Sequence, residues 1–137
     1  MVVCAVSDCE VGVDVEFLDK NILMIEQILC SRSELEYIYS KRFTLQEKNL
    51  ILYKIWTYKE NFLKMIGTGI VFPLGQISVD FECNKIINET NFEKDNYIRE
   101  QFIDGYLVST CMSEENSVFY KNFTIGKFEK ELSKMRS

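Results

Sequence analysis

The chain has 137 residues, 47% hydrophobic and 27% charged, and a formal net charge of −5. This size and composition are typical of one globular domain and exclude a disordered chain, while the negative charge excludes a global basic field for nucleic acid. Histidine is absent, which excludes a Ser-His or Cys-His nucleophile built from this chain alone, and the five cysteines include no C-x-x-C pair, which argues against a zinc site.

The cysteines and the first residues indicate the compartment. An odd number of scattered cysteines with apolar neighbours predicts reduced, partly buried thiols. Residues 1–6, MVVCAV, are too short for a signal peptide and carry no positive lead. No apolar run approaches the length of a membrane span. We therefore expect a cytoplasmic protein with neither a membrane nor a nucleic-acid partner.

Two strands are predicted at the start of the chain. Residues 2–6 have the composition of a buried strand, residues 8–10 of a turn, and residues 11–16 of a second strand. Strand side chains alternate between faces. The valines at 11, 13 and 15 therefore share one face, and Asp14 and Glu16 project side by side from the other.

Helices follow. Residues 20–30 and 33–40 are predicted as short helices, with Ser31 or Ser33 capping the second. A longer helix is expected over residues 45–66, capped by Thr44 with Glu47 completing a capping box. The signals that end it are Gly67, Gly69 and Pro73.

The rest of the chain predicts mainly strands. Alternating patterns indicate antiparallel strands at residues 77–83, 97–103, 106–112 and 118–124, with Asp104-Gly105 as a hairpin turn. Residues 126–135 are predicted as a short helix. The sum is a single α+β domain over residues 1–137, with helices packed on one face of a mostly antiparallel sheet.

The helix predicted at residues 45–66 breaks its own pattern. Its apolar stripe consists of Leu52, Ile55, Trp56, Leu63 and Ile66, and Lys59 falls near the centre of that stripe. In one interpretation Lys59 extends to water, and Glu60 and Lys64 form an ordinary surface pair. In the other, the stripe ends at a cleft in which Lys59 contacts an anionic ligand. Both remain open.

Glu60 gains meaning beside the predicted acidic strand. Together with Asp14 and Glu16 it makes three carboxylates, a donor set that suits a hard cation such as Mg²⁺. The condition is that the strand at 11–16 packs beside the helix at 45–66.

Two motifs carry a family resemblance. Residues 12–16, GVDVE, and residues 56–64, WTYKENFLK, resemble the signatures G-[IV]-D-[IV]-E and W-[ST]-x-K-E-[SA]-x-x-K of the 4′-phosphopantetheinyl transferase superfamily. Further similarities lie at residues 29–34, 67–70 and 104–109, so the match covers nearly the whole chain. The tryptophan makes the chain more similar to the larger, surfactin-synthetase-activating type than to the small holo-acyl-carrier-protein synthase type.

The resemblance implies residue roles. Asp14, Glu16 and Glu60 match the family's magnesium ligands, and Glu60 also matches the residue proposed to deprotonate the carrier serine. Lys59 and Lys64 match lysines near the coenzyme A phosphates, and Lys64 also has a catalytic role at the leaving group. Trp56 is expected to pack. The implied reaction is Mg²⁺-dependent transfer of 4′-phosphopantetheine from coenzyme A to a serine of an acyl or peptidyl carrier protein, giving 3′,5′-ADP.

One departure from the family pattern leaves alternatives open. The larger type has two similar halves with coenzyme A between them, and this chain matches the second half only. The N-terminal half, with its histidine and its basic residues for the 3′-phosphate, is absent from the match. The chain is then a piece of a longer protein, a homo-oligomer in which a second copy supplies the missing wall, or a non-catalytic half that binds coenzyme A or carrier protein without turnover. An unrelated small α+β domain requires every motif match to be accidental.

Overall fold

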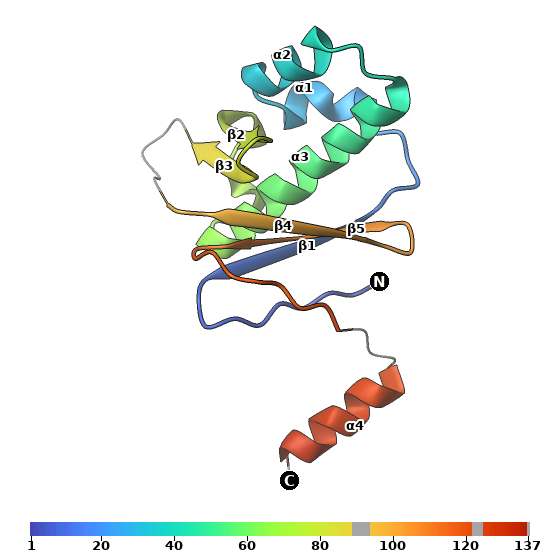
Figure 1. Cartoon of the computed structure of the whole chain (residues 1–137), viewed down its shortest axis with the longest axis vertical. Helices are drawn as coiled ribbons and strands as arrows, with labels where there is room; N and C mark the ends of the chain where they lie inside the picture. The colour runs from blue at the N-terminus through green and yellow to red at the C-terminus, as the bar shows by residue number, and fades with distance from the viewer. Residues whose placement is uncertain (89–93, 122–124, 137) are drawn as a thin grey trace.

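The computed structural model describes residues 1–88, 94–121 and 125–136. In chain order it contains β1 (Val11–Phe17), a 3-10 turn η1 (Leu23–Ile25), α1 (Glu26–Leu29), α2 (Arg32–Ser40), α3 (Leu45–Ile66), two more 3-10 turns η2 (Gly69–Val71) and η3 (Leu74–Gln76), β2 (Ile77–Asp80), β3 (Lys85–Asn88), β4 (Tyr97–Ile103), β5 (Tyr106–Met112) and α4 (Ile125–Arg136). Figure 1 shows α3 crossing one face of a sheet, with the short helices at its upper end.

The main sheet is antiparallel, with the strand order β1-β5-β4. The hairpin between β4 and β5 turns at Asp104 and Gly105, whose φ angles are 49° and 79°, as the Asp-Gly signal predicts. In the pairing of β1 with β5, Asp14 lies opposite Ser109. Directly opposite side chains share a face of a sheet, so this register places Ser109 beside the acidic residues of β1.

Helix α3 is delimited as its sequence predicts. The Thr44 side chain accepts a hydrogen bond from the Glu47 amide, and the Glu47 side chain accepts one from Thr44 N, which completes the capping box. Gly67 ends the helix in the left-handed conformation, with φ 77°. A capping box with Ser31 and Glu34 likewise starts α2, which selects Ser31 over Ser33.

Helix α3 lies directly on β1. A Cβ atom added to Gly12 would be 1.8 Å from the carbonyl oxygen of Asn61, so only glycine permits this approach. Because side chains two residues apart share a strand face, Asp14 and Glu16 also face the helix. The acidic face of β1, and not its valine face, is therefore the one turned toward α3.

The core forms between α3, the short helices and the sheets. Its fully buried members include Leu52, Ile55 and Leu63 of the predicted apolar stripe, while Trp56 and Ile66 pack against it partly buried. The Glu100 carboxylate of β4 accepts hydrogen bonds from Lys54 Nζ at 2.7 Å and from the Tyr58 hydroxyl at 2.6 Å. This pair of contacts ties α3 to the sheet.

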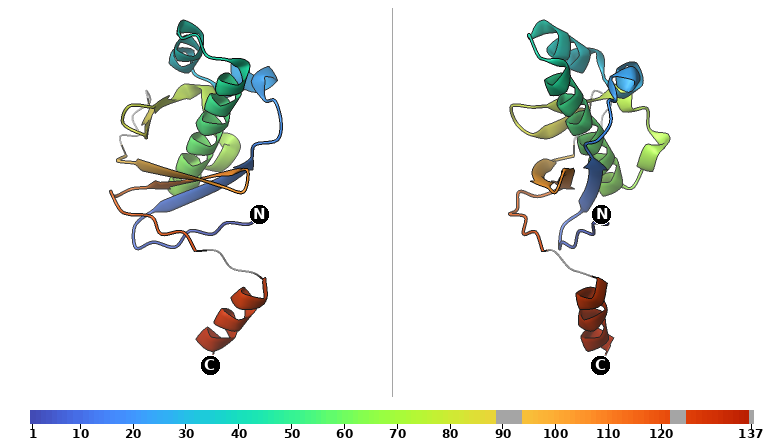
Figure 2. Two further views of the ribbon diagram at one scale, coloured as in Figure 1. Left: turned by 45° about the vertical axis from the view of Figure 1, so that its right-hand side comes forward. Right: turned by 90° about the vertical axis from the view of Figure 1, so that its right-hand side faces the viewer.

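A second, two-stranded sheet was only half predicted. β2 and β3 pair antiparallel, with Ile77 opposite Asn88, whereas the sequence pattern indicated one strand at residues 77–83 and none at 85–88. The chain turns between them because Asp80 Oδ1 accepts hydrogen bonds from the amides of Glu82 and Cys83. Figure 2 shows this small sheet beside α3.

Two strand predictions are wrong for the described residues. Residues 2–6 form no strand, and Val2 and Val6 are 97% and 94% exposed. An apolar run becomes a strand only where a neighbour accepts its backbone hydrogen bonds, and no such neighbour lies beside it in the described part. Residues 118–121 also form no strand. The remainder of that prediction, residues 122–124, lies outside the described residues.

The last helix is set apart. The helix predicted at residues 126–135 is confirmed as α4. Figures 1 and 2 show α4 away from the body of the molecule. The five cysteines are free thiols, with Cys30 and Cys111 buried, as the sequence predicts. Among the described helices, none is long and apolar enough to cross a membrane.

Candidate functional site

The two motif segments meet where α3 lies on β1. Lys64 Nζ of α3 is 2.6 Å from Asp14 Oδ1 of β1 and 3.1 Å from the Val13 carbonyl oxygen. Asp14 is 8% exposed and Glu60 6% exposed, whereas the Lys64 side chain is 47% exposed. Lys64 therefore pairs with Asp14, and the surface pair with Glu60 that one interpretation required does not form.

The three carboxylates lie within electrostatic reach of one another. Burial raises the pKa of Asp14 above its ordinary value, against a lowering by Lys64. Burial also raises the pKa of Glu16, with further increases from the charges of Asp14 and Glu60, while a hydrogen bond from the Trp56 side chain opposes it. The pKa of Glu60 is raised by burial and by Asp14, and lowered by Lys64. Closely placed, partly buried carboxylates with raised pKa values are common at functional sites.

The chemistry of this donor set fits a hard divalent cation. Asp14 Oδ2 is buried and has no hydrogen-bond partner among the residues that the structure describes. An unpaired buried carboxylate oxygen is costly unless a cation or donor satisfies it. As the side chains stand, however, no three acidic or cysteine side chains in the described residues come together closely enough to hold an ion. The Lys64 ammonium occupies the contact with Asp14 instead. Metal ligation by Asp14, Glu16 and Glu60 stays a prediction.

Lys59 requires a correction. Its side chain is fully buried, and its ammonium donates to Glu34 Oε2 at 2.6 Å, to the Leu29 carbonyl at 2.8 Å and to the Leu74 carbonyl at 2.9 Å. All three donors of an ammonium are thereby used. In this structure Lys59 extends neither to water nor into a cleft, so both interpretations of its side chain are wrong. Binding of coenzyme A phosphates by Lys59 stays a prediction.

Glu34 is the residue that sequence reasoning missed as the partner of Lys59. Its carboxylate also accepts hydrogen bonds from the amides of Ser31 and Val79, both at 2.7 Å. A lysine in the centre of an apolar stripe requires a buried counter-charge. The capping glutamate of the short helix was the available signal, but sequence spacing does not reveal which of several glutamates is buried.

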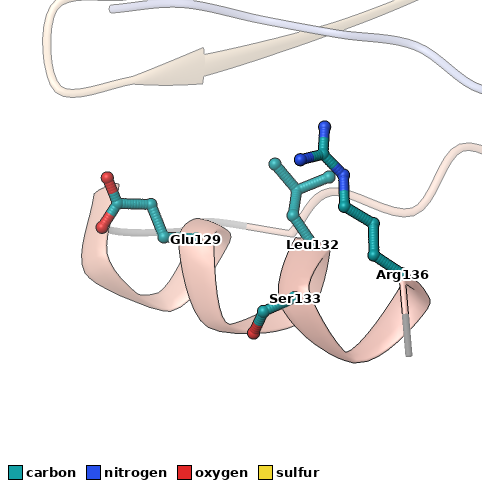
Figure 3. A pocket seen from close by; sticks show the side chains of 4 residues that line it. All are labelled: Glu129, Leu132, Ser133 and Arg136. Atoms are coloured by element: carbon teal, nitrogen blue, oxygen red, sulfur yellow. The ribbon is translucent and has the colours of Figure 1, made fainter.

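A hollow elsewhere on the surface does not belong to this site. Figure 3 shows it on α4, lined by Glu129, Leu132, Ser133 and Arg136. None of the predicted site residues lines it, and we assign it no role in the chemistry of the carboxylates.

Comparison with known proteins connects this geometry to a family. The model of the 4′-phosphopantetheinyl transferase superfamily matches residues 10–111. The chain is 29% identical over 112 residues to the 4′-phosphopantetheinyl transferase gsp of Aneurinibacillus migulanus, covering 80% of this chain and 46% of the relative. It is 26% identical over 134 residues to the transferase Sfp of Bacillus subtilis (strain 168), covering 96% and 58%.

A third relative and one solved structure add to this. The 4′-phosphopantetheinyl transferase ffp of Bacillus subtilis is 33% identical over 122 residues, covering 87% of this chain and 53% of the relative. The chain therefore spans about half the length of the curated relatives it matches. The crystal structure of Thermotoga maritima holo-[acyl-carrier-protein] synthase matches with a TM-score of 0.60 and 16% identity, over 75% of this chain and 61% of that one. This match shows a common α+β fold.

Proposed function

Since the chain belongs to the 4′-phosphopantetheinyl transferase superfamily, we propose that it transfers 4′-phosphopantetheine from coenzyme A to a serine of an apo carrier protein. The serine oxygen forms a bond to the β-phosphorus of coenzyme A. The bond from that phosphorus to the bridging oxygen breaks, and 3′,5′-ADP leaves. The products are the holo carrier protein and 3′,5′-ADP.

The observation that carries the proposal is the contact between Lys64 and Asp14. It joins the acidic strand and the helix motif at one place. Besides burial, the Asp14 charge raises the pKa of both Glu16 and Glu60 there. Buried acidic groups beside one half-exposed lysine suit a reaction in which diphosphate charge must be neutralised. The proposal rests on Lys64 and not on Lys59, whose ammonium pairs with the buried Glu34 carboxylate.

Each residue has a proposed task. Asp14, Glu16 and Glu60 hold Mg²⁺, which when bound would neutralise charge on the diphosphate. Glu60 accepts the proton of the carrier serine, directly or through a water molecule. Lys64 turns from Asp14 to the phosphate oxygens and offsets charge on the departing 3′,5′-ADP.

Coenzyme A needs a second wall. In our proposal this wall comes from a second copy of the chain or from a further segment of polypeptide, because the chain spans only about half the length of its relatives. We place the reaction in the cytoplasm, where coenzyme A and carrier proteins are available.

The test is the mass of an apo carrier protein after incubation with this chain, coenzyme A and Mg²⁺. We expect the mass to increase by one phosphopantetheine group, and to stay unchanged with Asp14→Ala or Glu60→Gln protein that remains folded. Thr57→Ala is the matched control on α3, because the Thr57 hydroxyl bonds only within its own helix. Full activity in Asp14→Ala protein would contradict the site assignment.

A second candidate function follows from the length of the match. A half-domain that binds coenzyme A or carrier protein without turnover agrees with a match to about half of each relative. In that case the mass assay gives no adduct, while calorimetry still detects coenzyme A or carrier protein binding.

A further inference from the structure

A buried polar contact beside the candidate site has no assigned role. Asn61 and Ser109 are both fully buried, and Asn61 Nδ2 of α3 donates to Ser109 Oγ of β5 at 2.5 Å. Asn61 directly follows Glu60 in the chain, and Ser109 lies opposite Asp14 in the sheet. The contact therefore joins a residue next to Glu60 to a residue opposite Asp14, and both Glu60 and Asp14 are predicted metal ligands.

The backbone of α3 is held at the same point. A Cβ atom added to Gly12 would be 1.8 Å from the Asn61 carbonyl oxygen and 2.7 Å from the Met65 amide nitrogen. Asn61 thus contacts β1 through its backbone and β5 through its side chain. One turn further along α3, Lys64 reaches Asp14.

This polar contact carries an energetic cost that packing alone does not explain. Asn61 Oδ1 is buried and has no hydrogen-bond partner in the described part of the chain, and an unsatisfied buried amide oxygen opposes folding. Apolar contacts are non-directional and permit a helix to rotate or slide on a sheet. A directional hydrogen bond fixes one rotation of the helix, so the contact favours a specific arrangement over maximal stability.

We propose that Asn61 and Ser109 are positioning residues, which set the rotation of α3 on the sheet and so hold Glu60 and Lys64 against Asp14. This inference rests on the proposed function for its catalytic meaning, but its geometric content is independent of it. The family signature has Ser or Ala where this chain has Asn61, so the contact is a feature of this chain and not of the motif.

The first test is the affinity of the full chain for Mn²⁺, measured by electron paramagnetic resonance of the free ion. Asn61→Ala and Ser109→Ala should each weaken Mn²⁺ binding by about tenfold, the usual effect of losing a group that orients metal ligands. The exchanged pair, Asn61→Ser with Ser109→Asn, should restore most of the affinity. Thr57→Ala, a buried polar change one turn away on α3, should leave the affinity unchanged.

The second test needs no metal. Double-mutant cycles with Lys64→Met and Asp14→Asn, measured by urea unfolding, give the coupling between these two residues as a ratio of unfolding constants. We expect this ratio to fall toward one in the Asn61→Ala background and to remain as in the unmodified chain in the Thr57→Ala background. A purely structural Asn61 would lower stability without changing the coupling.

The outcomes separate the two claims. Unmodified protein that binds no Mn²⁺ contradicts the metal site of the proposed function, and the coupling measurement then decides the positioning role alone. An undiminished Lys64–Asp14 coupling in Asn61→Ala protein overturns the inference. An Asn61→Ala protein that binds Mn²⁺ as tightly as the unmodified chain overturns it as well.

Discussion

Lys64 is the residue at which binding and stability compete. Its ammonium contacts Asp14 Oδ1 at 2.6 Å, yet nearly half of its side chain is exposed, so it can leave for solvent. A cation that binds Asp14 must displace this internal positive charge. The ion pair therefore offsets the charge of Asp14 alone, and the proposed Mg²⁺ would have to compete with Lys64 for that carboxylate.

Replacing Lys64 should change two properties in opposite directions. We expect Lys64→Met to bind Mn²⁺ several-fold more tightly, because the competing ammonium is gone, and to lose most transfer activity. Calorimetric titration with Mn²⁺ measures the first effect and the carrier-protein mass assay the second. Lys48→Met is the control, because Lys48 lies over the Tyr39 ring and away from the acidic residues. Weaker Mn²⁺ binding in Lys64→Met would contradict the competition.

Glu60 should make the fold less stable at neutral pH than a neutral residue would. Burial and Asp14 raise its pKa above 4.5, so its contribution to stability is present below pH 4.5 and is lost as the pH rises through the raised value. We expect Glu60→Gln to match the unmodified chain at acidic pH and to exceed its stability by on the order of 1 kcal/mol at neutral pH. Urea unfolding at both pH values measures this.

Stability should depend on pH in the opposite direction at Glu47, which therefore serves as the comparison for Glu60. The capping hydrogen bonds lower its pKa, so its contribution is present above the unfolded pKa and is lost as the pH falls. Glu47→Gln should therefore be less stable than the unmodified chain at neutral pH and should approach it in acid. The same pH dependence in both variants would contradict the assignment of a raised pKa to Glu60.

At the scale of elements, the buried pair of Lys59 and Glu34 joins α3 to α2 and β2. Burial lowers the pKa of Lys59 and the Glu34 charge opposes that change, while Glu34 also accepts a hydrogen bond from the Val79 amide. Removing one partner leaves the other charged and buried. The pair therefore has a structural role, although Lys59 belongs to the helix motif.

Lys59→Met should destabilise the chain by roughly 3–5 kcal/mol, the cost of an uncompensated buried charge. Adding Glu34→Gln should recover part of the loss, because both charges are then absent. The recovery should be incomplete, because the Gln side-chain oxygen can replace only one of the two carboxylate oxygens that accept from the Ser31 and Val79 amides. Urea unfolding of the single and double variants gives both values. Arg32→Met, which breaks an exposed pair with Glu36, should hardly change stability. A comparable loss in Arg32→Met and Lys59→Met would contradict this account.

The contact between α3 and β1 gives a second prediction for the elements. Gly12→Ala places a methyl group 1.8 Å from the Asn61 carbonyl oxygen, and backbone on both sides cannot move aside cheaply. We expect a loss of at least about 3 kcal/mol, at the upper end for overpacking, measured by thermal unfolding. Gly126→Ala in α4 meets nothing within 4 Å and should be tolerated. A stable Gly12→Ala protein would show that the helix can sit further from the sheet.

How far the sequence predicts this fold differs between elements for physical reasons. The capping box of Thr44 and Glu47, the glycine at 67 and the Asp-Gly hairpin are local signals, and each is confirmed. The strand prediction for residues 2–6 was wrong because a strand depends on a partner that local composition does not reveal. The buried surroundings of Lys59 were not predicted for the same kind of reason, since its counter-charge Glu34 lies on another element.

The sequence predicted the placement of the candidate site residues only in part. The alternation of β1 placed Asp14 and Glu16 on one face, and the structure turns that face toward α3. The sequence could not show that Lys64 would form an ion pair with Asp14, or that Asn61 would donate a hydrogen bond to Ser109. Those contacts depend on strand register and helix rotation, which arise only from packing.

For the whole molecule, α4 is the part whose removal should matter least. Its residues, Ile125–Arg136, lie apart from the body in both Figures 1 and 2, and a helix of this length is only marginally stable alone in water. We expect a chain shortened by residues 125–137 to unfold at the same urea concentration as the full chain and to lose helical circular dichroism only in proportion to the deletion.

The same shortened chain should retain Mn²⁺ binding, because Asp14, Glu16 and Glu60 lie on β1 and α3. If deletion instead lowers the unfolding midpoint or the Mn²⁺ affinity, α4 contributes to the folded body in solution. In that case a dependence of the midpoint on protein concentration would distinguish contact between copies from contact within one chain, since only association changes with concentration.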